Sequence, residues 1–315
     1  MALAAHRIVL LGALLVLSAA GATAQTPVPP AKVDPGRFGE KRPDPAFGAF
    51  QRGLYITALN IALPRAREGD AAAQVLVADI YARGLGVPQN GKEAANWYEK
   101  AADQGVAEAQ FQFALILLDG KLVPADPKRA RSLMQEAADA GIRLAQFNLA
   151  QLIIDQEPGD AGLEKAVVYY ERAAKAGLAD AQYAMSQIVA NGIGGKASDE
   201  AGARGWLTLA ARQNFDTAQV DLATWLIEGI GGPRDLEAGF LWMRRAAQGG
   251  NVAARNRLAK LYVAGVGTEP DVIEGAAWYI NARRAGLTDR YMDDFMQGLT
   301  DEELKQAIER TSKLR

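Results

Sequence analysis

The stretch DAAAQVLVADIYARGLGVPQNGKEAANWYEKAADQG, residues 70–105, decides the fold of this 315-residue chain, because five variants of it follow one another. An alanine that precedes glutamine or arginine marks the same point in every copy, at Ala73, Ala109, Ala145, Ala181, Ala218 and Ala254. The successive spacings are 36, 36, 36, 37 and 36 residues. Such a period is typical of a stacked array, in which each copy buries its apolar face against its neighbours.

Each copy is predicted to form a helix, a turn and a second helix. In the first copy, apolar residues recur at helical spacing from Val75 to Tyr81, glycines interrupt at Gly84 and Gly86, and a second helical pattern follows. Glycine adopts the positive φ that ends a helix at little cost. Turn glycines recur in every copy except the third, where residues 156–159 read QEPG, so we expect a differently shaped loop there.

Two columns of the pattern describe the expected core. One is small in every copy, as helices that cross about 8–10 Å apart require; it contains Ala78, Ala114, Ala150, Ser186, Ala223 and Ala259. The other is large and apolar, at Tyr81, Leu117, Ile153, Val189, Leu226 and Tyr262 on the first helix and at Trp97, Leu133, Tyr169, Trp206, Trp242 and Trp278 on the second. We expect both columns to be core positions.

The residues AQVLVADIYARGLGVP (73–88), followed by ANWYEKAADQG (95–105), resemble the Sel-one-like repeat, a relative of the tetratricopeptide repeat. The resemblance implies an all-α protein, a right-handed α-solenoid of helix-turn-helix repeats, that holds other proteins and carries out no chemistry. The six repeats are residues 70–105, 106–141, 142–177, 178–214, 215–250 and 251–286. Residues 46–69 resemble a divergent N-terminal helix pair.

The two ends of the chain differ from the repeats. Residues 1–24 contain Arg7, a short apolar stretch and the motif Ala22-Thr23-Ala24, which together predict a cleaved secretory signal. The alternative is an uncleaved membrane anchor, but the apolar stretch is shorter than the ~20 residues that a span needs. Residues 25–45 are rich in proline and are expected to be an extended linker. Residues 287–315 are expected to form capping helices, the last opened by the capping box Thr300–Glu303.

Composition excludes most catalytic and metal sites. The only histidine is His6 and there is no cysteine, which excludes Ser-His and Cys-His catalysis and metal sites built on imidazole or thiolate. We therefore expect no cofactor and no enzyme. Loss of Arg7 with the signal takes the net charge from −2 to −3, so nucleic acid is not an expected partner. The predicted location is the periplasm or the exterior, without stable membrane insertion.

The candidate binding surface lies on the first helices, which line the concave groove in tetratricopeptide-like arrays. One predicted groove column contains Val75, Phe111, Phe147, Tyr183, Val220 and Asn256, and the next contains Asp79, Leu115, Gln151, Gln187, Thr224 and Lys260. The second column varies in chemistry, as a recognition surface should. For the aromatic residues the alternative is packing between repeats. A polar stripe beside the turns, Asp119, Asp155, Asn191 and Glu228, is a further candidate, for which the alternative is local turn hydrogen bonding or a solvated edge.

These observations predict a non-catalytic periplasmic scaffold that binds a protein or an extended peptide in its groove. The partner-binding residues are predicted to be Phe111, Leu115, Phe147, Gln151, Tyr183 and Gln187. One alternative is a periplasmic regulator that restrains a membrane sensor protein. Another is an envelope hydrolase that acts through two carboxylates, although no spacing selects such a pair.

Overall fold

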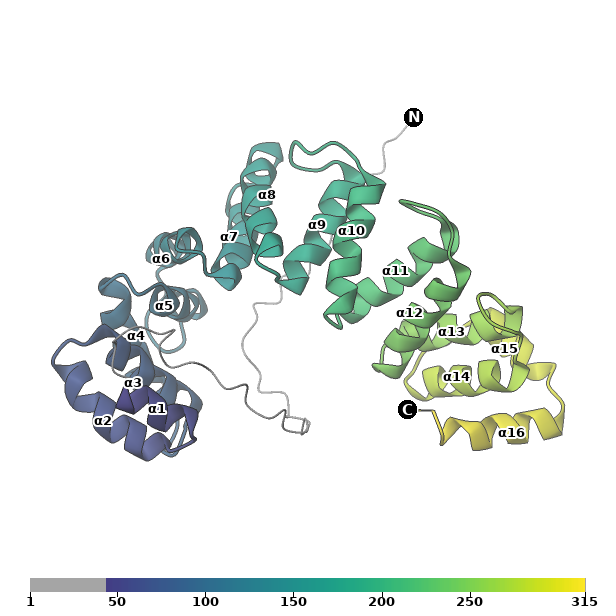
Figure 1. Cartoon of the computed structure of the whole chain (residues 1–315), viewed down its shortest axis with the longest axis horizontal. Coiled ribbons are helices and arrows are strands. Elements are labelled where there is room, and N and C mark those ends of the chain that lie inside the picture. Colours follow the sequence, from purple (N-terminus) through teal and green to yellow (C-terminus); the bar gives the residue numbers. More distant parts are fainter. Residues whose placement is uncertain (1–43, 315) are drawn as a thin grey trace, which may run out of the picture. The chain divides into compact units, whose positions relative to one another are not determined.

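The computed structural model describes residues 44–314, and every regular element in that range is an α-helix (Figure 1). The helices are α1 (Pro45–Gln51), α2 (Tyr55–Arg67), α3 (Ala71–Arg83), α4 (Gly91–Asp103), α5 (Ala107–Asp119), α6 (Pro127–Asp139), α7 (Arg143–Gln156), α8 (Asp160–Lys175), α9 (Ala179–Asn191), α10 (Glu200–Arg212), α11 (Asp216–Glu228), α12 (Leu236–Gln248), α13 (Val252–Ala264), α14 (Val272–Arg284), α15 (Arg290–Gln297) and α16 (Asp301–Thr311). The predicted signal and nearly all of the predicted linker lie outside the described residues.

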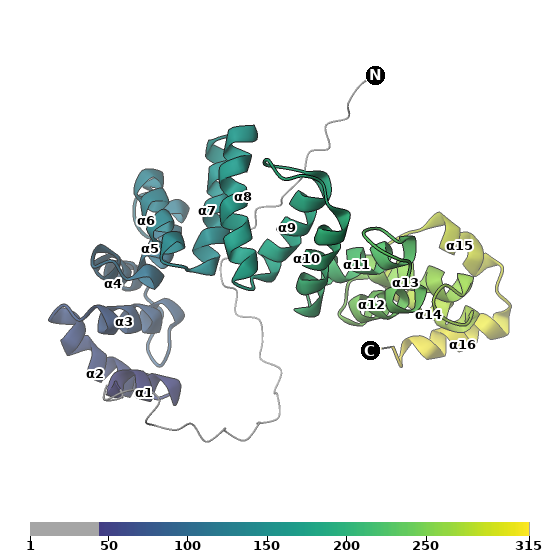
Figure 2. The same cartoon turned by 45° about the horizontal axis from the view of Figure 1, so that its top comes forward.

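The helices fall into two compact units, which divide between Gln151 and Leu152 within α7. In the first unit, each helix from α1 to α5 packs against the next. In the second, consecutive helices pack from α8 to α14, and both views show α11 to α14 side by side (Figures 1 and 2). Helical content and the packing of consecutive helix pairs confirm the prediction of an all-α solenoid.

The turns behave as the glycine pattern predicts. The first helices of five copies end on a left-handed glycine with φ between 63° and 79°, at Gly84, Gly120, Gly192, Gly229 and Gly265. The third copy differs, as expected. There α7 continues to Gln156, Gly159 with φ 111° precedes α8, and α8 has 16 residues, whereas the second helices of the other copies have 13.

The small column lies in the core of every copy, so its prediction is confirmed. All six members are 0% exposed. In the fifth and sixth copies they face a glycine on the second helix: a Cβ added to Gly239 would lie 2.9 Å from the carbonyl oxygen of Ala223, and one added to Gly275 would lie 3.0 Å from that of Ala259. The earlier copies have a buried alanine at the equivalent position, at Ala94, Ala130, Ala166 and Ala203. This second small column was not anticipated from the sequence.

The column of large residues is only partly core, so that prediction is wrong for half of it. Leu117, Ile153, Leu226, Trp97, Leu133 and Trp278 are buried, but the other six members keep part of their surface in solvent. Two of the partly exposed rings, those of Tyr169 and Trp242, are covered by arginine side chains. The guanidinium of Arg245, for example, lies 5.4 Å from the ring centroid of Trp242.

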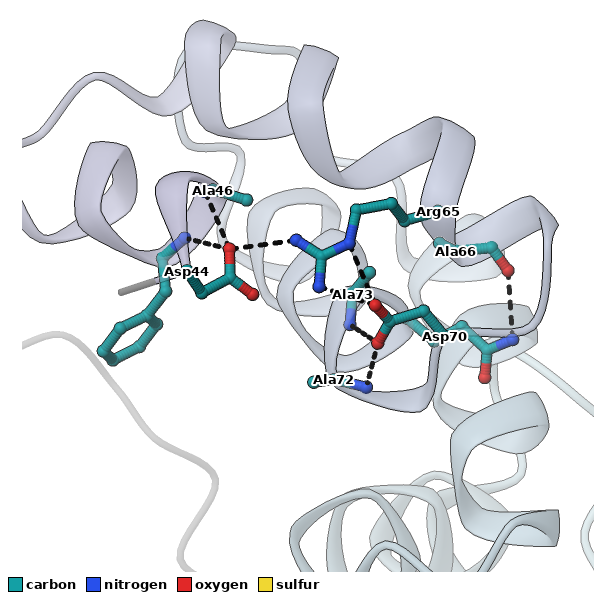
Figure 3. A network of polar contacts seen from close by, with 9 residues as sticks. Asp44, Ala46, Arg65, Ala66, Asp70, Ala72 and Ala73 are labelled. Carbon is teal, nitrogen blue, oxygen red and sulfur yellow. Dashed lines mark hydrogen bonds and ion pairs between the residues drawn. The ribbon is translucent and has the colours of Figure 1, made fainter. Parts of the chain in front are cut away.

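A charged network fixes the N-terminal helices to the first copy (Figure 3). Arg65 of α2 donates to Asp44 at 3.0 Å and to Asp70 at 2.6 and 2.9 Å. Asp44 accepts the first backbone N–H groups of α1, and Asp70 accepts those of α3. The hydrogen bond from Arg65 lowers the pKa of Asp44, and the backbone N–H of Ala73 together with Arg65 lowers the pKa of Asp70. One guanidinium thus ties three helices together.

The C-terminal helices cover the last copy. Helix α16 packs against α14, with Ala307 buried and an ion pair between Arg310 and Glu274. The capping box is confirmed, because the Thr300 side chain accepts from the backbone of Glu303 and the Glu303 side chain accepts from that of Thr300. Leu304 and Ile308 remain exposed, so Ala307 supplies the contact.

Candidate functional site

The glutamine that marks each copy orients the first helix on the preceding copy. The amides of Gln74, Gln146, Gln182 and Gln219 donate to the carbonyl oxygens of Ala66, Ala138, Ala174 and Ala211, each eight residues earlier, at 3.0–3.2 Å. Arg255 donates to Ala247 in the sixth copy at 3.3 Å. These carbonyl oxygens belong to the last turn of the preceding helix, and each also accepts the backbone N–H three residues further on, so the side chain is a second donor. The exception is Gln110, which donates to Glu136 at 2.5 Å.

The two predicted groove columns differ in burial. Phe111 and Phe147 are 5% and 7% exposed, and Val220 and Asn256 are buried as well, while Val75 and Tyr183 are partly exposed. The column of Leu115 is partly exposed in every copy, at Asp79, Leu115, Gln151, Gln187, Thr224 and Lys260. The burial favours the packing alternative for Phe111 and Phe147 and leaves the second column facing solvent.

The structure distributes the six predicted binding residues over three helices. Phe111 and Leu115 lie on α5, and Phe147 and Gln151 lie on α7, all within the first unit. Tyr183 and Gln187 lie on α9 of the second unit. Their role in binding stays a prediction.

In the first unit, the half-buried carboxyl group of Asp79 on α3 has a partner on α4. The hydroxyl of Tyr98 on α4 donates to Asp79 at 2.5 Å. Burial raises the pKa of Asp79 and also raises the pKa of Tyr98. The pair locks the ring of Tyr98 against α3.

In the second unit, a polar cluster joins the first helices of the last three copies. Tyr183 on α9 donates to Asp221 on α11 at 2.9 Å and stacks on Phe215, with ring centroids 5.1 Å apart. Arg257 on α13 donates to Thr224 at 3.2 Å. Burial raises the pKa of Asp221, although the hydroxyl of Tyr183 opposes this.

Sequence reasoning missed Asp221 and Arg257, although a signal for them existed. They occupy the position three residues after the marker alanine, which holds Leu76, Gln112, Asn148, Ala184, Asp221 and Arg257. That position varies in chemistry as strongly as the predicted recognition column. If chemical variation had been applied as a criterion at every position, this position would have been part of the candidate surface.

In the sixth copy, the groove positions are used inside the chain. Lys260 and Asn256 donate to Asp289 at 2.5 and 2.9 Å, and Asp289 also caps the start of α15. The hydrogen bond from Lys260 is the main cause that lowers the pKa of Asp289 to about 2. The sixth copy therefore does not offer these two side chains to a partner.

The polar stripe beside the turns makes local contacts where its partners are seen. Lys121 donates to Asp119 at 2.6 Å, and Asn191 donates to the carbonyl oxygen of Gln187 at 2.8 Å. Asp155 and Glu228 are exposed. These contacts favour the interpretation as turn hydrogen bonds and a solvated edge.

Within residues 44–314, no group of three or more acidic, histidine or cysteine side chains is arranged to hold a metal ion. Within the same residues, no helix is both long and apolar enough to cross a bilayer.

Stacked helix pairs with a constant small core column and a chemically variable free face define an α-solenoid repeat protein. The Sel1 repeat model matches residues 71–106, 107–142, 143–178, 179–215, 217–251 and 252–287. The chain belongs to the Sel1 repeat family.

Solved structures of similar proteins have the same fold. A protective antigen of uropathogenic Escherichia coli with an SLR fold is 26% identical, with a TM-score of 0.71 over 85% of this chain and 60% of its own. A Sel1 repeat protein from Oxalobacter formigenes is 25% identical, with a TM-score of 0.64 over 78% of this chain and 97% of its own. Chitin synthase regulatory factor 3 of Schizosaccharomyces pombe is 31% identical over 84 residues, which are 26% of this chain and only 9% of that protein.

Proposed function

We propose that the protein is a non-catalytic scaffold that binds another protein, or an extended segment of one, along the free faces of its first helices. The observation that carries this proposal is the contrast between two columns on the same helices. The small column is fully buried and nearly invariant, whereas the column of Leu115 is partly exposed and differs in every copy except two. Packing explains the first column, and recognition of a specific partner explains the second.

The chemistry of the exposed column suits a polypeptide partner. Gln151 and Gln187 each offer a carboxamide that donates to and accepts from an extended backbone, and Leu115 offers apolar area. Tyr183 adds a ring held in place by Phe215 and Asp221. Aromatic side chains give contact area at a low cost in conformational entropy. Phe111 and Phe147 support this surface from below.

We also propose that the scaffold works in the periplasm or outside the cell. The support is the sequence of residues 1–24, which has the charge, apolar stretch and Ala-x-Ala motif of a secretory signal. A regulatory role is a second candidate, favoured by one observation: the fungal relative is named a regulatory factor. On that reading, the partner is a membrane sensor that the scaffold restrains.

The test is capture of partners from envelope extracts by the mature protein and by the triple variant Leu115→Glu, Gln151→Glu, Gln187→Glu. A matched control is Asn96→Glu, Leu209→Glu, Gln248→Glu, which introduces the same number of negative charges at exposed positions of the second helices. We expect the first variant to lose its captured partner with unchanged helical circular dichroism, and the control to retain it. Loss in both variants, or in neither, would contradict binding along the first helices.

A further inference from the structure

The second glycine of each turn allows the turn to approach the start of the preceding second helix. A Cβ at Gly231 would overlap the carbonyl oxygen of Glu200, and one at Gly267 would overlap that of Leu236. At the turn of the second copy this arrangement is reversed, because the glycine lies on the preceding helix and the larger residue lies in the turn. Leu122 stands in the turn, and Gly91 stands on the helix, where an added Cβ would lie 2.8 Å from Cδ2 of Leu122. A side chain, rather than backbone, fills this junction.

Next to this reversed contact lies a cleft of about 480 Å³, entirely within the first unit. It is lined by Ala82, Gln89, Gly91, Ala94, Tyr98, Gln112, Ile116 and Leu122. These residues come from α3, α4, α5 and the two turns, and α4 packs against both α3 and α5. The volume is within the range of sites that hold small molecules or single side chains.

The cleft is preformed on one side and has two carboxamides with unused hydrogen-bonding atoms on the other. The hydrogen bond from Tyr98 to Asp79 at 2.5 Å fixes the aromatic wall. Gln89 donates its amide to the carbonyl oxygen of Ala82 at 2.9 Å, which leaves the carboxamide oxygen of Gln89 without a donor in the described chain. The side chain of Gln112 makes no hydrogen bond within residues 44–314. These groups can bond to a ligand that has both donors and acceptors.

The lining selects an uncharged ligand. None of its eight residues is ionised, so a charged group that entered would lose hydration without gaining a counter-charge. The side chains of Ala82, Ala94, Ile116 and Leu122 offer apolar contact. A peptide supplies both requirements, because its apolar side chain matches the walls and its backbone N–H and C=O match the two carboxamides.

We propose that this cleft binds a large apolar side chain, of the size of leucine or phenylalanine, carried by an extended segment of the protein partner. The backbone of that segment bonds to Gln112 and Gln89. The inference rests on the proposed function in one respect, that the partner is a polypeptide. The cleft is an anchor separate from the six residues predicted from the sequence.

The test uses the N-acetyl methylamides of leucine, phenylalanine, aspartate and lysine as probes of the full-length protein. Nuclear magnetic resonance titration follows the side-chain amide signals of Gln89 and Gln112. We expect the two apolar probes to shift these signals with dissociation constants of about 1 mM, as such small ligands allow, and the charged probes to leave them unchanged. Binding of charged probes as tight as that of apolar ones, or no binding of any probe, would overturn the proposal.

Two variants locate the binding. Ala82→Phe fills the cleft, and Ala190→Phe adds the same ring at the equivalent, partly exposed position of the fourth copy. We expect Ala82→Phe to weaken phenylalanine binding at least tenfold and Ala190→Phe to leave it unchanged, with both variants equally helical. Equal binding by the wild type and a folded Ala82→Phe variant refutes the site. Gln112→Ala, a change at a partly exposed position, should weaken binding severalfold.

The result is independent of the capture experiment. If the probes bind at the cleft but the Leu115, Gln151 and Gln187 variant still captures its partner, binding along the first helices fails and the cleft stands. If partner capture depends on those three residues but no probe binds, the cleft proposal fails and the proposed function stands.

Discussion

Replacement of one helical glycine by alanine should have opposite effects in two neighbouring copies. Gly205 on α10 and Gly239 on α12 both lie in the interior of a helix in the second unit. A Cβ added to Gly205 meets nothing within 4 Å, whereas one added to Gly239 lies 2.6 Å from Cγ1 of Ile227 and 2.9 Å from the carbonyl oxygen of Ala223. The first site is open, and the second is the closest contact between α11 and α12.

The magnitudes follow from two opposing effects. Alanine is favoured over glycine in a helix interior by about 1 kcal/mol, so we expect Gly205→Ala to raise the free energy of unfolding by about 0.5–1 kcal/mol. The same gain exists at Gly239. Overpacking, however, costs about 1–3 kcal/mol, and a backbone oxygen cannot rotate away as the Ile227 side chain can. Gly239→Ala should therefore be less stable than Gly205→Ala by about 1–3 kcal/mol.

Urea unfolding of the full chain, followed by circular dichroism, measures this difference. Because repeat arrays can unfold in more than one step, hydrogen exchange of peptides from α11 and α12 should localise the loss. We expect faster exchange there in Gly239→Ala and no change in Gly205→Ala. If the two substitutions stabilise the protein equally, the close crossing of α11 and α12 is refuted, and with it the assignment of the second small column.

Three further predictions address other contacts. Gln219→Leu removes one of the donors to the carbonyl oxygen of Ala211, which keeps the backbone N–H of Asn214, and should lower the free energy of unfolding by about 0.5–1.5 kcal/mol, which chemical denaturation would measure; no change would mean that water replaces the amide. The folded pKa of Asp289 is lowered to about 2, so its stabilising contribution is present above its unfolded value of about 4 and is lost as pH falls toward 2. Asp289→Asn should flatten the pH dependence of melting between those values, and an unaltered profile would assign it to other carboxylates. Mass spectrometry of the secreted protein should find Gln25 as the first residue, and a chain that begins at Met1 would contradict cleavage.

The sequence predicts the elements of this fold well because the period repeats each local requirement six times. The alanine column at Ala78 identified the crossing point of every helix pair, and the glycine at Gly84 identified the end of the first helix. The missing glycine of the third copy correctly predicted its different loop. Each of these features depends on residues that are close in the sequence of one copy.

Contacts between copies were harder to predict. Leu122 and Gly91 compensate for each other although they belong to different copies, and neither looks unusual until the two are placed together. Asp221 meets Tyr183 from 38 residues away. Asp289, outside the repeats, takes the groove positions of the sixth copy. Periodicity aligns equivalent residues. It does not show which unusual residue in one copy contacts an unusual residue in another.

The glutamine bonds between copies give the array a direction. In four copies the marker glutamine donates backward, to the last turn of the helix pair before it. Loss of a copy from the C-terminal side would leave a terminal carbonyl, which water can reach. Loss of a copy from the N-terminal side would remove the acceptor of the next marker glutamine. The pair α1 and α2 therefore acts as the starting unit, since the carbonyl oxygen of Ala66 accepts from Gln74.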